Sequence, residues 1–362
     1  MNTNKHAVYR PTDYMYSSAL ARAKEVRLVG KEALSRLIDA PSEENAIALL
    51  AEHGYVPPTR VLPSPRELDD MLDRTLAELF NELEQALPSF DGVPVSALTA
   101  LRYPYDCNNV KTAIKCGEAG VSTDGLLFDV GAVSADDTLA LVSGKMEMED
   151  VKANGGSRAC GLPTHMTAAI DTAKEAYAAT KNPRMIDLIL DRACYEDMLE
   201  AAEAMGIPFL HEYVRTRIDC TNILTTLRLL RMYPSDKARL SDLMDKAVLG
   251  GGSITPNTLI SVIEGGREAL LDIIKREARF ERYADTVCSE DTSLSAAELV
   301  LDNVIGDFIA GAKPIASGAE VPVGYLLALE ISIKNVRIVL AGRRAGLDRA
   351  VIRERLRESY GA

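Results

Sequence analysis

Aromatic side chains are scarce in this chain, and tryptophan is absent. Phe, Tyr and Trp together make up 5% of the 362 residues, whereas hydrophobic residues of all kinds make up 47%. That hydrophobic content is enough to build a core and excludes a wholly disordered chain. With so few rings, the core has to consist of Leu, Ile, Val, Ala and Met, a composition that suits the packing of helix on helix.

Positive charge is also in short supply, and no long apolar run is present. The chain has 41 Lys and Arg against 53 Asp and Glu, which gives a formal net charge of -12. A protein this acidic is a poor ligand for a phosphate backbone, so we expect no nucleic-acid partner. No stretch approaches the roughly 18 apolar residues of a membrane span, and the first residues lack the apolar segment of a secretory signal. We therefore expect a cytoplasmic protein that is at most peripheral to a membrane.

Cysteine and histidine are few and scattered. The six cysteines form no Cys-x-x-Cys pair and the four histidines form no His-x-x-x-His pair. We expect reduced thiols that serve packing, and neither a structural zinc site nor a cofactor. No Ser, His and Asp group is suggested by spacing, so we also expect no catalytic site and no small-molecule substrate.

Helical periodicity dominates what is present. The predicted helices are residues 14–38, 66–87, 106–118, 163–180, 185–204, 219–232, 256–286, 294–310, 322–342 and 348–358. The expected N-caps are Ser42, Ser134, Thr255 and Asp348. No run alternates convincingly, although a short hairpin stays possible. The sequence thus predicts an all-α protein, with a proline-rich linker over 57–65.

Two sequence elements recur three times in the same order. The first is an asparagine with matching neighbours, at intervals of 113 residues: Asp106-Cys-Asn-Asn109-Val, Asp219-Cys-Thr-Asn222-Ile and Ser332-Ile-Lys-Asn335-Val. The second is an acidic element that ends 31–36 residues before each asparagine: Asp69-x-x-Leu72-Asp73, Asp187-x-x-Leu190-Asp191 and Glu298-x-x-Leu301-Asp302. Internal similarity at a fixed period indicates repeated structural units.

We therefore predict three related helical units, called repeats below, at residues 61–180, 181–292 and 293–362. The third repeat is short at its C-terminal end, and the N-terminal helices of residues 1–60 have no repeat ahead of them. Our hypothesis is that these N-terminal helices complete the third repeat. The three repeats would then close around a pseudo-threefold axis in a funnel-like arrangement.

Each repeated asparagine falls within the apolar stripe of its helix. A buried amide without partners costs roughly 1–3 kcal/mol, so we expect each one to be hydrogen-bonded. The expected partners are backbone carbonyls of an adjoining helix or the acid of a neighbouring repeat. We interpret the amides as structural groups that fix helix register, and a direct role in holding a partner protein stays open.

Two charged clusters suggest other functions. Asp69, Asp70 and Asp73 spell Asp-Asp-x-x-Asp, which could chelate magnesium in an all-helical synthase; solvated acids near a helix start are the simpler interpretation. The C-terminal end is basic, with residues Arg343, Arg344, Arg349, Arg353, Arg355 and Arg357. It is either a solvated helix face or a docking surface for an acidic partner or lipid headgroups.

Four stretches in order carry a resemblance to a known family. They are Tyr16-Ser-Ser-Ala-Leu-Ala-Arg22, Leu49-Leu50-Ala-Glu-His-Gly54-Tyr55, the repeated Asp106-x-x-Asn109 and Asp219-x-x-Asn222, and Glu330-x-x-x-x-Asn335-Val-Arg337. Together they resemble the C subunit of V-type/A-type ATP synthases, which is equivalent to the d subunit of eukaryotic V-ATPases. The resemblance spans nearly the whole chain, except for the stretch 144–161.

The resemblance implies a non-catalytic rotor part in ATP-coupled proton or sodium transport. It implies a socket on the cytoplasmic face of the membrane proteolipid ring that receives the central-stalk subunits D and F. We expect Arg337, Arg353 and Arg357 to be available for partner contact, and the loop 249–253 to approach the ring. A scaffold or adaptor of another complex is the alternative.

Overall fold

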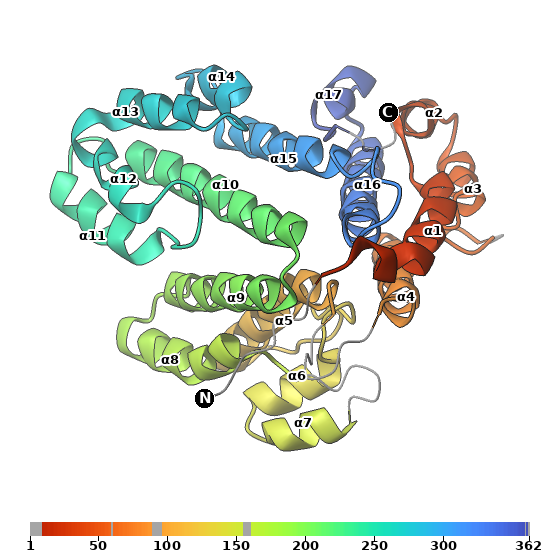
Figure 1. The fold of residues 1–362 in the computed structure, drawn as a ribbon, viewed down its shortest axis with the longest axis horizontal. Coiled ribbons are helices and arrows are strands. Elements are labelled where there is room, and N and C mark those ends of the chain that lie inside the picture. The colour runs from red at the N-terminus through yellow and green to blue at the C-terminus, as the bar shows by residue number, and fades with distance from the viewer. Residues whose placement is uncertain (1–8, 59–60, 89–95, 155–160, 359, 361–362) are drawn as a thin grey trace. The chain divides into compact units, whose positions relative to one another are not determined.

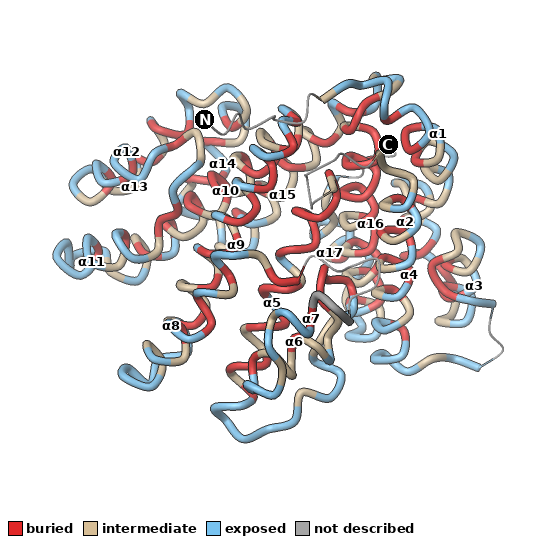
Figure 2. The backbone as a smooth tube through the Cα atoms, turned by 60° about the horizontal axis from the view of Figure 1, so that its bottom comes forward, coloured by how far each residue is buried: buried red, intermediate tan, exposed pale blue. Residues whose placement is uncertain are grey.

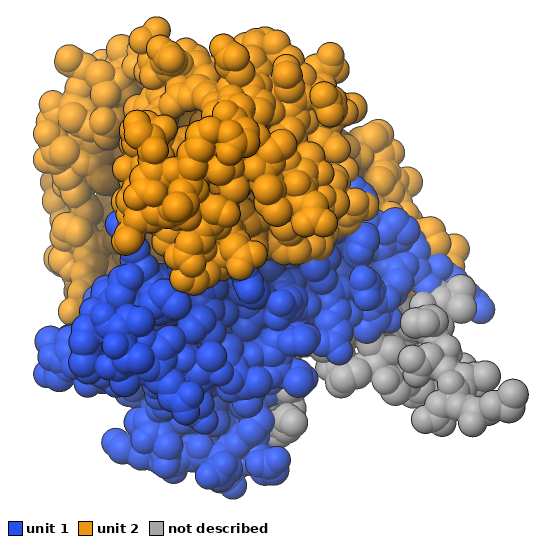
Figure 3. All heavy atoms as spheres, turned by 90° about the vertical axis from the view of Figure 1, so that its left-hand side faces the viewer, with its two compact units in different colours: residues 1–10, 80–214 blue, residues 11–79, 215–362 orange. Residues whose placement is uncertain are grey.

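The structure is a computed structural model of the chain, and it describes residues 9–58, 61–88, 96–154, 161–358 and 360. Within these residues the chain forms helices and turns without any β-strand, so the all-α prediction is confirmed (Figure 1). The chain divides into two compact units, which Figure 3 colours separately. Unit 1 comprises residues 1–10 and 80–214, and unit 2 comprises residues 11–79 and 215–362.

The helices of unit 1 form one packed group around α5. Unit 1 contains the end of α4 (Pro65–Gln85), α5 (Thr99–Ala119), α6 (Ala135–Val142), α7 (Met148–Asn154), α8 (Thr164–Thr180), α9 (Arg184–Met205) and the start of α10 (Pro208–Met232). Helix α5 packs against α6, α8 and α9, and α8 packs along α9. Because α5 is covered on several sides, it buries polar as well as apolar residues and has no single apolar face.

A buried arginine fixes the end of α4 to α5 and to the loop that follows α5. The guanidinium of Arg102 donates to the carbonyl of Val130 at 2.7 Å, to the Asn81 side chain at 2.9 Å and to the Glu84 carboxylate at 3.0 Å. It also lies 4.7 Å from the centre of the Phe80 ring. A buried charge is tolerated because it is paired and hydrogen-bonded in this way.

Helix α16 is the centre of unit 2. This unit contains α1 (Met15–Lys24), α2 (Lys31–Asp39), α3 (Glu43–Glu52), most of α4 and α10, α11 (Lys237–Ala247), α12 (Pro256–Ile260), α13 (Val262–Arg276), α14 (Ala284–Cys288), α15 (Leu294–Ala310), α16 (Glu320–Arg344) and α17 (Arg349–Glu354). Helices α1, α2, α15 and α17 all pack against α16. Buried residues therefore follow one another along α16, as Figure 2 shows.

The N-terminal helices are tied to the C-terminal part of unit 2 by arginines that satisfy backbone carbonyls. Arg22 of α1 donates to three carbonyls just after α15, those of Ala312, Lys313 and Ile315. Arg343 of α16 donates to the carbonyls of Ile38 at 2.7 Å and Ser42 at 3.2 Å, at the end of α2 and the start of α3. A cation suits the carbonyl of Ile38 in particular, because the last carbonyls of a helix carry partial negative charge.

Three predicted helices are shorter than expected. The helix predicted over 14–38 is wrong as one piece, because the chain becomes extended at Leu28 (ψ 131°) and α2 starts only after Gly30. The helix predicted over 256–286 is wrong as one piece, because the chain forms α12, α13 and α14 there and becomes extended at Glu277 (ψ 107°). Helix α13 is also kinked at Gly266, whose φ of 59° and ψ of -142° are open mainly to glycine. The C-terminal helix ends at Glu354 rather than at residue 358.

The N-cap residues were predicted more accurately than the lengths of the helices. The side chains of Ser42, Ser134 and Thr255 accept backbone N–H groups at the starts of α3, α6 and α12, as predicted. Asp348 is the N-cap residue of α17, as predicted, but its side chain makes no capping hydrogen bond. Among the described helices, none is long and apolar enough to cross a membrane.

Candidate functional site

Three buried asparagines, one on each of α5, α10 and α16, make the same pair of hydrogen bonds. They are Asn109, Asn222 and Asn335. In each, the side-chain N–H donates to the carbonyl of one loop residue, and the side-chain oxygen accepts the N–H of that same residue. The loop residues are Phe128, Leu249 and Arg357, and all N···O distances lie between 2.7 and 3.0 Å. We call each pair of bonds a backbone clamp.

The clamp satisfies the amide, but with a different partner from the one expected. The partner is a loop residue of the same repeat, not a carbonyl of an adjoining helix or the acid of a neighbouring repeat. The amide nitrogen donates to the carbonyl of the loop residue, and the amide oxygen accepts the N–H of that residue. Both polar atoms of the buried side chain are therefore hydrogen-bonded.

A carboxylate holds the same loop at a second point in the first two repeats. Asp106 and Asp219 lie three residues before the clamping asparagines, and each accepts two consecutive N–H groups at 2.9–3.1 Å. The N–H groups belong to Ala132 and Val133 in the first repeat and to Ser253 and Ile254 in the second. The next residue is the N-cap of a helix in both cases, so the carboxylate fixes where that helix begins.

Burial has an electrostatic consequence for this carboxylate. Desolvation raises the pKa of Asp219, while the bonds from the N–H groups of Ile254 and Ser253 lower it, and burial is the larger effect. The two N–H groups thus stabilise the charged form of the buried Asp219 carboxylate, which burial alone would disfavour.

Close approach of the carboxylate requires glycine in each of these loops. A Cβ atom would lie 2.1 Å from Asp106 Oδ1 at Gly131, and 2.2 Å from Asp219 Oδ1 at Gly252. Both distances are far below contact, so any side chain would displace the carboxylate. The signal was visible in the sequence, since Gly131-Ala-Val-Ser134 and Gly252-Ser-Ile-Thr255 both place glycine three residues before an N-cap.

In the third repeat the second holding point is supplied by the N-terminal part of the chain. Ser332 stands in place of the aspartate, and its hydroxyl accepts the N–H of Val29 at 3.0 Å. It also lies 2.7 Å from the hydroxyl of Tyr55. Val29 directly precedes Gly30, the N-cap position of α2, just as the bonded residues precede the N-caps in the other repeats. Serine is shorter than aspartate, and here Arg27 occupies the position of the glycine.

The acidic elements of the first two repeats form ion pairs with the asparagine-bearing helix of a different repeat. In unit 1, Lys111 lies two residues after Asn109 and forms an ion pair with Asp191 of α9. In unit 2, Arg337 lies two residues after Asn335 and binds Asp69 at 3.1 Å and Asp73 at 2.6 Å, both on α4.

Between α10 and α15, a cysteine thiol makes the contact to the acidic element that an ion pair makes in the other two helix pairs. Cys220 donates to the carbonyl of Leu301 at 3.6 Å, and Cys107 of α5 donates to the carbonyl of Leu190 on α9 at 3.4 Å. Both cysteines lie two residues before the clamping asparagine, and burial raises the pKa of Cys220 to about 12. The five described cysteines are buried and form no disulfide, whereas Cys160 lies outside the described residues.

Asp302 is the most heavily paired acid of the three elements. Its carboxylate accepts from Lys334 at 2.5 Å and from Arg357 at 2.9 Å. Burial alone would raise the pKa of Asp302, but the positive charges of Lys334, Arg217 and Arg357 outweigh it and lower the pKa.

The arginines expected to meet a partner all have partners within the chain. The side chain of Arg357 is only 12% exposed, whereas that of Arg353 is 44% exposed and donates to both carboxylate oxygens of Asp39 at 2.8 and 2.9 Å. Arg337 is bound by the two α4 acids, and Glu330 lies part-buried on α16. Of these arginines, Arg353 has the most exposed side chain.

The other sequence candidates are placed differently from the expectation. Asp69 and Asp73 of the Asp-Asp-x-x-Asp element both bind the guanidinium of Arg337, so a cation of the chain itself occupies the face considered for magnesium. The side chain of Leu249 is buried and its backbone is held by Asn222, so this part of the loop 249–253 is turned inward.

Sequence comparisons place these features in a family. The sequence model described as "ATP synthase (C/AC39) subunit" matches residues 17–355. The match runs from α1 to just beyond α17, and it includes all three clamping asparagines.

Curated relatives match over nearly their whole length. The C subunit of the V-type sodium ATPase of Enterococcus hirae is 23% identical over 96% of this chain and 99% of its own. The C subunit of the A-type ATP synthase of Methanocaldococcus jannaschii is 24% identical over 95% of this chain and 86% of its own. The same protein of Haloferax volcanii is 27% identical over 92% and 94%.

Replacing a clamping asparagine by aspartate tests the clamp. Asn222→Asp removes the N–H donor and sets a negative charge against the carbonyl of Leu249, so we expect a loss of roughly 3 kcal/mol or more in the free energy of unfolding. Asn257→Asp on the exposed surface of α12 is the matched control and should change stability by less than about 0.5 kcal/mol. Equal stabilities of the two variants in denaturant titrations would contradict the clamp.

A double-mutant cycle tests the close approach of glycine and carboxylate. Gly252→Ala should cost about 1–3 kcal/mol through overpacking against Asp219. In an Asp219→Ser background, which copies the third repeat, the same change should cost clearly less because serine leaves room for the methyl group. Identical costs in both backgrounds, measured by urea unfolding, would show that the contact does not govern the loop.

The pH dependence of stability tests the ion cluster at Asp302. Its pKa is lowered on folding, so its contribution is present above the unfolded pKa of about 4 and is lost as the pH falls through the lower folded pKa. Asp302→Asn should therefore reduce stability by about 1–3 kcal/mol at neutral pH, and the difference from wild type should shrink below about pH 4. A difference that stays constant from pH 7 to pH 3 would contradict this assignment.

Proposed function

The chain belongs to the ATP synthase (C/AC39) subunit family, and we propose that it is the non-catalytic socket of a V/A-type rotary ATPase. In this role it links the central-stalk subunits D and F to the membrane proteolipid ring, on the cytoplasmic face of the membrane. It thereby couples ATP turnover to proton or sodium transport. The observation that carries the proposal is the match over residues 17–355 together with relatives that cover nearly the whole chain.

Stiffness is the property that such a link requires. Torque passes through a part only if the part resists deformation, and a loop held at one point can swing. Two holding points per loop remove that freedom, and buried hydrogen bonds are costly to break without replacement. The clamps at Asn109, Asn222 and Asn335 therefore support a mechanical role.

We further propose that residues 1–60 complete the third repeat and that the three repeats are related by a pseudo-threefold axis. In the third repeat the two holding points come from different ends of the chain, which supports this proposal. Arg357 near the C-terminus is the clamped residue, and Val29 near the N-terminus binds Ser332. The helix pairing supports it as well. Helix α5 contacts the acidic element of α9, α10 contacts that of α15, and α16 contacts that of α4.

The most suitable partner-facing feature lies beside Arg353. A groove of ≈ 490 Å³ is bounded by α2 and the C-terminal segment, and its lining includes Lys31, Leu34, Ile38, Arg353 and Leu356. Three basic side chains, those of Lys31, Arg353 and Arg357, line the groove against one acid, Glu358. Apolar lining with this excess of positive charge suits an acidic segment of a stalk protein. No nucleic acid, cofactor or small-molecule substrate enters this proposal.

Affinity purification from the host's membranes tests the proposal. We expect the tagged chain to recover subunits D and F and the proteolipid, identified by mass spectrometry. Recovery of a different set of proteins would favour the scaffold or adaptor alternative and would refute the socket.

Charge reversal tests the basic groove. Arg353→Glu should reduce recovery of the stalk subunits several-fold, because it removes an exposed cation of the groove and repels an acidic partner. Arg184→Glu, at an exposed position in unit 1, is the matched control and should leave recovery unchanged. Thermal unfolding of both variants establishes that they are folded, and unchanged stalk recovery with Arg353→Glu would remove this surface from the proposal.

A further inference from the structure

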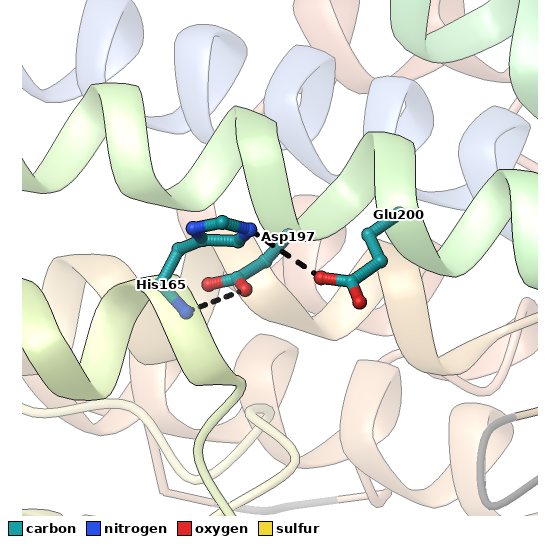
Figure 4. Close-up of side chains that lie close together, drawn as sticks. All are labelled: His165, Asp197 and Glu200. Atoms are coloured by element: carbon teal, nitrogen blue, oxygen red, sulfur yellow. Dashed lines mark hydrogen bonds and ion pairs between the residues drawn. The ribbon is translucent and has the colours of Figure 1, made fainter.

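A histidine and three carboxylates meet where α8 begins beside the second half of α9. His165, Asp197 and Glu200 each offer a ligand atom, and these atoms lie within 4.8 Å of one another. Figure 4 shows the imidazole of His165 above the Asp197 carboxylate, with one ring nitrogen directed to Glu200. The cluster lies entirely within unit 1 and takes no part in the clamps.

The buried member of the cluster is held rigidly. Asp197 accepts the backbone N–H of His165 at 2.9 Å and that of Met166 at 2.8 Å, so it fixes the start of α8 to α9. Each of its oxygens accepts one of these two bonds, and a carboxylate oxygen has capacity for a second interaction. The backbone of His165 is thereby set in place over the carboxylate.

The side chain of His165 lies between two glutamates on α9. Its Nε2 is 3.4 Å from Glu200, and its Nδ1 is 3.6 Å from Glu196. The two glutamates are four residues apart on one helix face, where like charges repel. With the buried Asp197 beside them, three carboxylates gather around one imidazole, which favours a cation in their midst.

We propose that His165 Nε2, Glu200 and Asp197 bind a divalent transition-metal ion, for which zinc is the probe. Imidazole and carboxylate together are common ligands for such ions, and water completes the coordination. The carboxylate of Glu196 lies 3.6 Å from Nδ1 and attracts that side of the ring, in the place where a metal-bound histidine usually has an orienting carboxylate. Two ligating carboxylates balance the charge of the ion.

The geometry requires only a small adjustment. Metal–ligand bonds of about 2.0–2.2 Å place neighbouring ligand atoms roughly 3.4 Å apart in a tetrahedral site. The separation between Nε2 and Glu200 already has this value. The other ligand atoms lie within 4.8 Å of one another, and small rotations of the exposed His165 and Glu200 side chains bring them to bonding positions while Asp197 stays fixed. A bound ion would fasten the start of α8 to α9 through side chains as well as through the backbone.

Titration calorimetry of the tag-free chain with zinc tests the site. We expect saturable binding of one ion with wild type, and a loss of at least tenfold in affinity with His165→Ala or Glu200→Gln. The alanine variant keeps the backbone bond to Asp197, so its fold is preserved, and circular dichroism in the presence of chelator checks this. His211→Ala is the matched control, because His211 lies 4.0 Å from a single carboxylate, that of Glu203, and its loss should not matter.

Two further measurements distinguish this site from zinc binding elsewhere on the chain. Glu196→Gln should weaken zinc binding about tenfold or more while leaving the stoichiometry intact, since it disturbs only the orientation of the ring. Cobalt bound at the cluster should give no thiolate charge-transfer band. Absence of saturable zinc binding, binding unaffected by His165→Ala, or a thiolate band that accounts for the bound cobalt would each overturn the proposal.

Discussion

The rest of this structure depends on one interaction, the backbone clamp. In it, a buried side-chain amide is hydrogen-bonded to both the N–H and the C=O group of one loop residue. The amide lies on a central helix. The residue to which it is hydrogen-bonded lies in a loop that follows this helix in the chain. Asn109 fixes Phe128, Asn222 fixes Leu249 and Asn335 fixes Arg357. An apolar side chain could fill the same space, but it would leave the loop's N–H and C=O groups buried and unpaired. The asparagines thus make it possible for irregular backbone to pass through the interior.

The consequences of the clamp extend to the neighbouring elements. Once the loop residue is fixed, the following N–H groups reach Asp106 or Asp219, and the close approach of the carboxylate then requires glycine. In the third repeat the chain ends soon after the clamped residue, and Ser332 receives an N–H from Val29 instead. The early end of α17 has the same cause, because Arg357 has to present its backbone to Asn335 rather than continue a helix.

Features governed by neighbouring residues could be predicted from the sequence, and features governed by distant partners could not. The caps at Ser42 and Thr255 follow from side chains that bond to N–H groups three residues ahead, and both were predicted. The break at Val29 depends on a hydroxyl 303 residues away, so helical periodicity across it was misleading. The asparagines and aspartates were found because they recur, while the recurring glycines were missed although the same comparison displays them. Clustering of His165 with Asp197 gave no signal, because neither spacing nor repetition connects the two helices.

Membership in the ATP synthase (C/AC39) subunit family agrees with the way in which the chain uses its buried polar groups. A non-catalytic subunit of an ATPase needs no reactive centre of its own. Asn222 and Asp219 accordingly bind backbone, while Asp302 binds the fixed cations of Lys334 and Arg357. The magnesium site considered at Asp69 and Asp73 is disfavoured for the same reason, because Arg337 binds both acids.

Residue-resolved amide hydrogen exchange tests the central claim most directly. The amides of Phe128, Leu249 and Arg357 lie outside helices, so only the clamps protect them from exchange. We predict that all three exchange as slowly as amides in the middle of α5, α10 and α16, and that Val29 is protected with them. Exchange of any clamped amide at the rate of an open loop would contradict the clamp, and rapid exchange at Val29 alone would contradict completion of the third repeat by the N-terminal segment.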